Sequence, residues 1–237
     1  MKYLIYVSLA LSCIVLRAQE RSFKWQQVAP GVWKATAGVP EEISPLHIVG
    51  IQPNTQALAK LGEPVFPENL QQSVNEISDA KTLLRFPLKR DEQLFGLGLN
   101  FKSVQQRGTI KELQVDHYGG KDDGRTHAPV ALYVSDKGYG VLINAARRIK
   151  VYAGIAVRKD SKNPPEEMNR NTQPDWDPQP YSDAVEIVVP ASGTEVYVFG
   201  GSNALEIVQR YNLFCGGGVL PPKWGLGFTQ RTPTLFS

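Results

Sequence analysis

Cysteine is scarce in this sequence. Only Cys13 and Cys215 occur among 237 residues, and Cys13 lies within an apolar stretch near the start of the chain. If that stretch is a cleaved leader, Cys215 is left as a single cysteine and no intrachain disulfide can form. The composition therefore excludes a disulfide-stapled scaffold, and the fold must be held by its hydrophobic core.

A membrane-spanning hydrophobic run is also missing. The apolar run at residues 4–16 follows Lys2 and precedes the small residue Ala18, whereas a transmembrane helix needs about 20 apolar residues. This pattern predicts a signal peptide cleaved near Ala18 and export to the periplasm or the extracellular space. Two alternatives fit less well: a buried N-terminal helix, because polar residues 19–27 follow at once, and lipid attachment at Cys13, because the apolar run continues past it.

Charge of one sign is lacking as well. The chain has 26 basic and 23 acidic side chains, and loss of Lys2 and Arg17 with the leader would leave 24 against 23, a net charge of +1. A chain this close to neutrality gives no electrostatic reason to expect binding to nucleic acid or to an anionic membrane surface. The sequence also shows no internal repeat and no heptad pattern.

Glycine (21 residues) and proline (17 residues) are plentiful by contrast, and they favour many short elements joined by turns. Apolar and polar residues alternate through the middle of the chain, which is the period of a strand. Turn residues at Ser135–Gly138 and Pro190–Thr194 predict two hairpins. Many short strands with regular turns predict an all-β antiparallel sandwich. The predicted strands are Phe23–Trp25, Val32–Ala35, Leu83–Phe86, Val130–Val134, Tyr139–Ile143, Ile149–Tyr152, Val185–Val189 and Glu195–Phe199.

Three segments depart from the strand pattern. Residues 158–183 are rich in Pro, Asn, Asp and Glu, which predicts a long exposed loop. Residues 203–214 have apolar side chains at helical spacing after a capping residue, which predicts a helix. A weaker pattern predicts a helix over Glu68–Asp79. The C-terminal helix prediction rests on the apolar Leu205, Val208 and Tyr211 and on the capping residues Asn203 and Glu206.

Three stretches, taken in order, resemble the N-terminal region of glycoside hydrolase family 31. The first, Leu94-Phe-Gly-Leu-Gly-Leu-Asn100 with Gln106-Arg-Gly108, is similar to the family's FGLGE…RG strand and loop. The second runs from Val115-Asp-His-Tyr-Gly-Gly120 through residues 126–144 and is similar to its NxDxxxYG…GYGVxxxN pattern. The third, LPPKWGLGF at Leu220–Phe228, is similar to the LPPxWxLGF strand that leads into the family's barrel. Each stretch alone is weak, but their order and spacing make the resemblance specific.

The resemblance implies a galactose-mutarotase-like sandwich over residues 19–201, followed over residues 202–237 by a linker helix and the first strand of a (β/α)8 barrel. The implied parent activity, of the α-glucosidase or α-galactosidase type, is retaining hydrolysis of terminal α-linked sugars without a cofactor. The wording of residues 124–129 leans towards the α-galactoside side. Only nine residues follow Phe228, whereas a barrel takes about 200 or more. We therefore expect the catalytic barrel to be missing from this chain and the chain to be inactive by itself.

The resemblance also implies a substrate-binding set: Asp116, His117, Arg125 and His127. In the family, a loop of the sandwich reaches over the barrel, and its Asp hydrogen-bonds sugar hydroxyls where cleavage occurs. A carboxylate suits this role because it accepts two hydroxyl hydrogens as a fork. The alternatives are a turn-capping Asp before Tyr118, structural histidines and a salt-bridged surface arginine. No residue is assigned to catalysis and none to a metal.

Other candidates are weaker on chemical grounds. The adjacent acids Asp122-Asp123 and Glu166-Glu167 have no apolar neighbour to raise one pKa, so neither pair suits the acid and nucleophile of a glycosidase. Four tryptophans offer apolar ring faces on which a sugar can stack, and packing in a domain junction is the simpler role for the last of them. These are Trp25, Trp33, Trp176 and Trp224.

Two other functions stay open. A stand-alone carbohydrate-binding module would bind sugar saturably without hydrolysis and lose binding in Asp116→Ala or Trp176→Ala. The interaction half of a split enzyme would instead dock on a separately encoded barrel through the apolar residues between Leu220 and Phe236, because an apolar surface with no partner usually marks a contact. The coding sequence directly downstream distinguishes the two.

Overall fold

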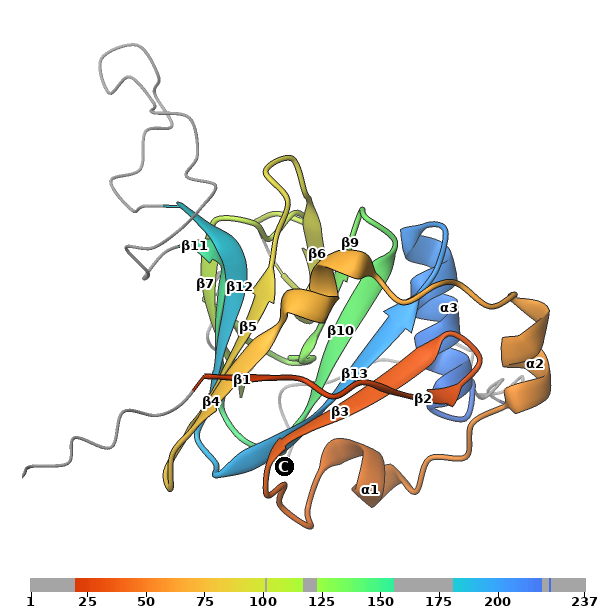
Figure 1. The fold of residues 1–237 in the computed structure, drawn as a ribbon, viewed down its shortest axis with the longest axis horizontal. Helices are drawn as coiled ribbons and strands as arrows, with labels where there is room; N and C mark the ends of the chain where they lie inside the picture. The colour runs from red at the N-terminus through yellow and green to blue at the C-terminus, as the bar shows by residue number, and fades with distance from the viewer. Residues whose placement is uncertain (1–19, 101, 117–122, 156–180, 219–221, 223–237) are drawn as a thin grey trace, which may run out of the picture.

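The computed structural model describes residues 20–100, 102–116, 123–155, 181–218 and 222. Two β-sheets pack face to face, and short helices lie on one side of them (Figure 1). This arrangement confirms the predicted all-β sandwich. One sheet has seven strands, in the spatial order β1 (Arg21–Ser22), β4 (Val74–Ile77), β5 (Thr82–Pro87), β12 (Tyr181–Val189), β11 (Ile149–Ile155), β7 (Thr109–Val115) and β8 (Arg125–Thr126). The other has six, in the order β2 (Gln26–Ala29), β3 (Val32–Gly38), β13 (Gly193–Gly200), β10 (Tyr139–Asn144), β9 (Leu132–Ser135) and β6 (Leu94–Gly96).

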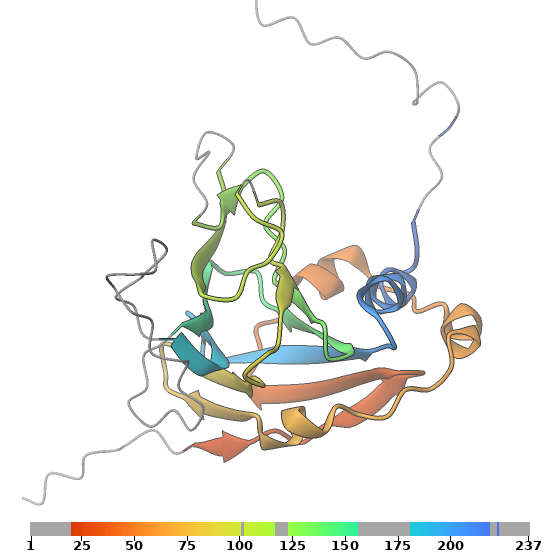
Figure 2. The same ribbon diagram turned by 90° about the horizontal axis from the view of Figure 1, so that it is seen from above.

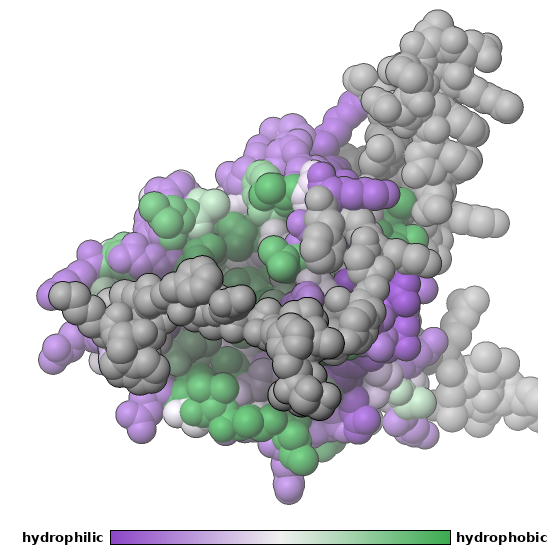
Figure 3. Space-filling view, turned by 180° about the vertical axis from the view of Figure 1, so that it is seen from behind, coloured by the Kyte–Doolittle hydropathy of each residue, from purple (hydrophilic) through white to green (hydrophobic). Residues whose placement is uncertain are grey.

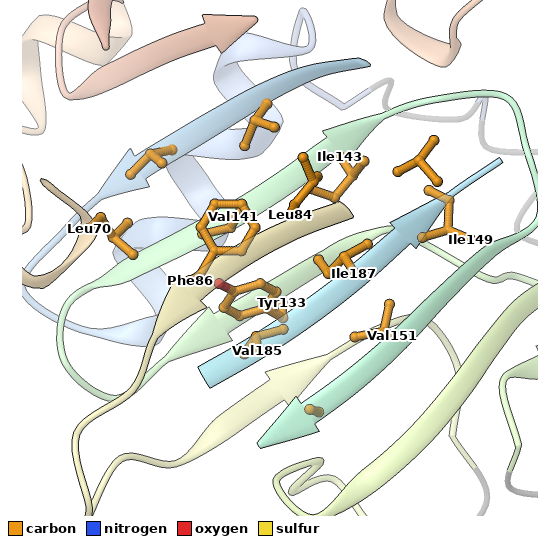
Figure 4. Close-up of a cluster of buried hydrophobic side chains, with 14 of the residues drawn as sticks. Leu70, Leu84, Phe86, Tyr133, Val141, Ile143, Ile149, Val151, Val185 and Ile187 are labelled. Atoms are coloured by element: carbon orange, nitrogen blue, oxygen red, sulfur yellow. The ribbon is translucent and has the colours of Figure 1, made fainter. Parts of the chain in front are cut away.

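The main core lies between the two sheets. Val141 and Ile143 of β10 face Val185 and Ile187 of β12 in this layer, and all four side chains are buried (Figure 4). Burial of each such side chain stabilises the fold by about 1.5–3 kcal/mol. The alternation of apolar residues along these strands therefore fixes which face of each sheet points inward.

The six-stranded sheet is buried on both faces. In β13, Val196 and Val198 face the main core, while Tyr197 and Phe199 face a second apolar cluster that includes Phe214. The cluster is closed by α1 (Pro45–Val49), α2 (Thr55–Lys60) and α3 (Ala204–Phe214), of which α1 and α3 lie on the same side of the sheet in Figure 2. A strand covered on both faces reads as nearly continuously apolar, as β10 and β13 do over Val141–Ile143 and Val196–Phe199.

One buried arginine ties the helices to the sandwich. The Arg210 side chain in α3 has no exposed surface. Its guanidinium donates hydrogen bonds to four backbone carbonyls and forms an ion pair with the carboxylate of Glu206. These carbonyls belong to Gly200 at the end of β13, Pro30 before β3, and Leu61 and Gly62 after α2. A single side chain therefore joins three parts of the chain that are distant in sequence.

Most predicted strands are present, and the hairpin at Ser135–Gly138 is confirmed by antiparallel pairing of β9 with β10. The hairpin predicted at Pro190–Thr194 is wrong. β12 pairs with β5 and β11 in one sheet, whereas β13 pairs with β3 and β10 in the other. The turn after β12 therefore carries the chain from one sheet to the other. The strand predicted at Phe23–Trp25 is also wrong, because this segment lies between β1 and β2, which belong to different sheets.

The helix predictions need two corrections. The C-terminal helix and its cap are confirmed, since the side chain of Asn203 accepts a hydrogen bond from the Glu206 backbone N–H. Its buried face is different, however: Leu205 is 77% exposed and Val208 is 39% exposed. Instead of one helix, Glu68–Asp79 forms a 3-10 helix over Glu68–Gln72 and then strand β4. The helix face that packs on the sheet carries Ile207, Arg210 and Phe214.

The long loop predicted at residues 158–183 ends earlier than expected, because β12 begins at Tyr181. The rest of that loop, the predicted leader at residues 1–18, Trp176 and Trp224 all lie outside the described residues. So does most of the motif at Leu220–Phe228. Within the part of the chain that the structure describes, no helix is long and apolar enough to cross a membrane.

Candidate functional site

The predicted site residues sit where the seven-stranded sheet reaches one of its edges. β7 ends at Val115, and β8 beside it pairs with β7 in parallel. Two backbone hydrogen bonds join β7 and β8 at their ends. The Glu112 N–H donates to the Asp123 carbonyl (2.7 Å), and the Asp116 N–H donates to the Thr126 carbonyl (3.0 Å). The backbone at both ends of the 116–124 connection is therefore held by the sheet itself.

Gly124 makes this close approach of the two strands possible. Its backbone φ is +95°, and a Cβ placed there would lie 2.6 Å from the backbone nitrogen of Glu112. Only glycine adopts this conformation without strain and leaves room for the neighbouring strand. The glycine thereby sets the position of Arg125, which directly follows it.

Arg125 lies between two carboxylates. Its Nε and Nη2 atoms are 2.9 Å and 2.8 Å from Oδ2 of Asp123, while its Nη1 is 3.7 Å from Oδ2 of Asp116. The backbone N–H of Arg125 also donates to Oδ1 of Asp123 at 3.2 Å. All three side chains are partly exposed, at 30% for Arg125, 28% for Asp116 and 43% for Asp123. The hydrogen bond from Arg125 lowers the pKa of the Asp123 carboxyl, so that carboxyl is unsuited to act as a general acid.

The structure thus brings Asp116 and Arg125 together, as an ion pair at the rim of the sheet. His127 is exposed and follows β8 directly. His117 lies outside the described residues. The roles of these four residues in binding stay predictions.

Sequence reasoning missed two polar side chains beside this ion pair. Oε1 of Gln114 and Oγ1 of Thr126 are buried, and neither has a hydrogen-bond partner within the described ranges. Gln114 is the register partner of Arg125 in the β7–β8 pair. Buried polar atoms are satisfied in the great majority of cases, so these two atoms are exceptions among the described residues. The alternation of inward and outward side chains along β7 and β8 is the one sequence feature that could have indicated the burial of Gln114 and Thr126.

An apolar pocket of about 280 Å³ adjoins the site. Leu113 of β7 lines it, three residues before Asp116, and so does Pro129, shortly after β8. Exposed apolar side chains continue the surface around α1, including Ile48 and Val49. Seen from behind, apolar side chains gather on this side of the molecule, with one cluster along the lower edge (Figure 3). The pocket is lined mainly by Leu46, Leu113, Val130, Leu142, Ile149 and Tyr211.

The other candidates have structural surroundings. Trp33 is buried in the core, and the partly buried Trp25 packs against that core and stacks on Phe23 at 5.1 Å between ring centroids. Nη1 of Arg107 donates to the backbone carbonyls of Lys89 and Glu92. Cys215 is a free, half-buried thiol. Over the ranges that the structure describes, no group of three His, Cys, Asp or Glu side chains is placed to hold a metal ion.

Comparisons with known proteins place this geometry in context. No family model matches the chain. An α-xylosidase, XylQ, from Lactiplantibacillus pentosus is 24% identical over 142 residues, which is 60% of this chain and 15% of XylQ. An α-xylosidase from Emericella nidulans is 24% identical over 165 residues, 65% of this chain and 18% of that protein. The chain therefore spans less than a fifth of the length of these curated relatives.

Solved structures give the same fold. A dextranase of family GH31 from Flavobacterium johnsoniae, in complex with glucose, aligns with a TM-score of 0.56 at 18% identity, over 86% of this chain and 27% of the dextranase. A xylosidase from Aspergillus niger aligns with a TM-score of 0.53 at 11% identity, over 86% of this chain and 32% of the xylosidase. Together with the sequence relatives, these structures show that the chain matches a fragment of the N-terminal domain of GH31 enzymes.

Proposed function

We propose that this chain is the sugar-binding N-terminal part of a retaining α-glycosidase of family 31, and that Asp116 contributes to the subsite for a terminal α-linked sugar. The observation that carries the proposal is the position of Asp116, partly exposed directly after β7, beside the edge strand β8, and ion-paired with Arg125. The resemblance of residues 94–228 to the family and the kinship with α-xylosidases support it.

The chemistry of the ion pair suits a sugar. A carboxylate accepts hydrogen bonds from two vicinal hydroxyls, and the neighbouring guanidinium of Arg125 forms an ion pair with it. A hydroxyl-rich ligand therefore meets acceptors on this edge, whereas an anionic ligand meets the carboxylates of Asp116 and Asp123.

Catalysis itself is proposed to need a second domain. A retaining glycosidase needs two carboxyl groups about 5–5.5 Å apart, one of them a general acid with a raised pKa. Within the described site, Arg125 is ion-paired with both Asp116 and Asp123, and it lowers the pKa of Asp123. We therefore propose that the chain alone shapes a subsite and does not hydrolyse glycosides.

The apolar pocket is the proposed place where that second domain docks. The curated relatives are more than five times as long as the segments that match this chain, so most of each relative lies beyond the sandwich. Leu113 of β7 lines the pocket and Asp116 directly follows the end of that strand, so a domain covering the pocket would meet the sugar held by Asp116. The apolar lining is the surface such a contact removes from water.

A binding titration tests the proposal. Isomaltotriose and methyl α-D-xylopyranoside are titrated into the protein while sugar signals are followed by saturation-transfer NMR, because half of a subsite is expected to bind weakly, with Kd on the order of 1 mM. Asp116→Asn removes the charge with little change in shape and is expected to weaken binding about tenfold or more. The matched control is Glu41→Gln, which removes a partly exposed carboxylate paired with Arg147 far along the chain. Equal sugar binding by Asp116→Asn and the unaltered protein would refute the role of Asp116.

A stand-alone carbohydrate-binding module remains the second candidate. It shares the binding predictions, but it needs no partner for the apolar pocket. Val130→Asp would place a charge in that pocket. Unchanged sugar binding by the isolated variant, together with loss of activity when a barrel domain is supplied, would favour the enzyme part over the module.

A further inference from the structure

We infer that Arg125 is a positioning residue, locked by Asp123, which fixes the carboxylate of Asp116 for the hydroxyls of the sugar. The inference rests on the proposed function; it adds Asp123 to the site and gives Arg125 a positioning role. Its basis is the unequal spacing of the two carboxylates around one guanidinium.

The short contacts go to Asp123. Two side-chain nitrogens of Arg125 and its backbone N–H all lie within 3.2 Å of the Asp123 carboxylate. Both the side chain and the backbone of Arg125 are therefore anchored to the same acid. Gly124 between them has no room for a Cβ, so the backbone that carries this clamp is fixed against β7.

The contact with Asp116 is of a different kind. At 3.7 Å, Nη1 of Arg125 lies within ion-pair distance of Oδ2 of Asp116 but beyond hydrogen-bond distance. The ion pair thus orients the Asp116 carboxylate without a direct hydrogen bond from Arg125 to it. The backbone of Asp116 is held separately, by its hydrogen bond to Thr126.

Asp123 determines which carboxylate accepts the hydrogen bonds of the Arg125 guanidinium. Guanidinium and carboxylate form short, paired hydrogen bonds whenever the geometry allows. If Asp123 lost its charge, Arg125 would be drawn to Asp116 and would compete with the sugar hydroxyls for the same oxygens. Loss of Arg125 would instead remove the ion pair that draws Oδ2 of Asp116 towards β8. Loss of the Asp123 charge and loss of Arg125 therefore both impair sugar binding through their effect on Asp116.

A double-mutant cycle on the full chain measures this. Arg125→Ala is expected to weaken binding of isomaltotriose about 5- to 10-fold, and Asp123→Asn about 3-fold, with Asp116 intact. The double variant is expected to bind no more weakly than Arg125→Ala alone, because Asp123 acts only through Arg125. Arg148→Ala is the matched control. This variant removes an ion pair between Arg148, which precedes β11, and Glu112 of β7, in which Nη2 of Arg148 lies 2.7 Å from Oε2 of Glu112.

A second readout needs no sugar. Three-bond NMR couplings to the side-chain carboxyl carbon report whether Asp116 occupies one χ1 rotamer or averages over several. The Asp116 couplings in Arg148→Ala are expected to match those of the unaltered protein, whereas a change in the χ1 populations is expected in Arg125→Ala. Unchanged couplings in Arg125→Ala would overturn the inference, as would additive losses of affinity in the double variant. If the unaltered protein binds neither isomaltotriose nor methyl α-D-xylopyranoside, the proposed function fails, and the couplings alone decide whether Arg125 positions Asp116.

Discussion

Replacement of Arg210 by alanine gives the sharpest test of how the helices are attached to the sandwich. The guanidinium is wholly buried and donates to carbonyls from three distant segments. Removal leaves those carbonyls without their donor inside the protein. The sandwich itself has its own core, so the expected consequence is loss of stability at the helical layer.

The magnitude follows from the geometry of the bonds. The contacts to Gly200 and Pro30 are 2.7 Å long and charge-assisted, and each such bond contributes about 1.5–3 kcal/mol. The contacts to Leu61 and Gly62 are 3.2 Å and 3.3 Å and share one nitrogen, so together they contribute about 1 kcal/mol. The ion pair with the partly exposed Glu206 adds little. Water entering the vacated space recovers part of the loss, and we expect about 4 kcal/mol in the free energy of unfolding.

Thermal unfolding followed by circular dichroism measures this loss. A change of about 4 kcal/mol corresponds to a drop in Tm of roughly 8–16 °C for a domain of this size. Arg210→Lys keeps the charge but lacks the planar fork, so an intermediate drop is expected. Arg148→Ala, which breaks an exposed pair, is expected to change Tm by no more than a few degrees. A loss below about 1 kcal/mol for Arg210→Ala would refute the reasoning from hydrogen-bond geometry.

Three further outcomes are expected. Gly124→Ala should destabilise the fold by about 2–3 kcal/mol in urea unfolding, since a Cβ there meets the Glu112 backbone, whereas Gly62→Ala, also at positive φ but with nothing within 4 Å, should cost only about 1 kcal/mol. Burial opposes ionisation of Glu195, but hydrogen bonds from Lys34 and Asn144 outweigh the effect of burial and lower the pKa of this carboxyl. The contribution of Glu195 to stability is therefore present above about pH 4.3 and is lost as the pH falls further. Lys34→Met should make the free energy of unfolding depend less on pH in this acid range. Expression with the native start should yield a secreted chain whose intact mass corresponds to cleavage near residue 18, and an uncleaved cytoplasmic product would contradict the leader prediction.

The strands were predictable because burial on one or both faces leaves a period of two in the sequence. Tyr139–Ile143 and Val185–Val189 both appear as strands for this reason. Pairing was less predictable, since a turn between two sheets and a hairpin turn have the same residue types. Pro190–Thr194 looked like a hairpin and instead joins the sheets. Local pattern fixes which residues are buried, while the partner of each strand depends on contacts distant in sequence.

The helices show the same limit. Asn203 correctly marked the start of α3, because a cap is a local hydrogen bond. The buried face was misassigned, since nothing in the local sequence indicates that Arg210 is buried by four backbone carbonyls. α1 and α2 are too short to show a helical period, although Ser44 and Asn54 cap them.

The site was only partly predictable. The family resemblance singled out Asp116 and Arg125, and the structure places them together. It did not single out Asp123 as the residue that holds Arg125, because the acid was equally consistent with a solvated loop. The unpaired acceptors of Gln114 and Thr126 depend on strand register, which no motif reveals.

Amide chemical-shift mapping with sugar is the most direct test of the central claim. Isotope-labelled protein is titrated with isomaltotriose, and the backbone signals that move identify the binding edge. We predict concentration-dependent shifts at Val115, Asp116, Arg125 and Thr126, with none at Glu41 or Arg147, which form a separate ion pair. Shifts confined to the pocket around Leu142, or no shifts at any residue up to saturating sugar, would contradict it.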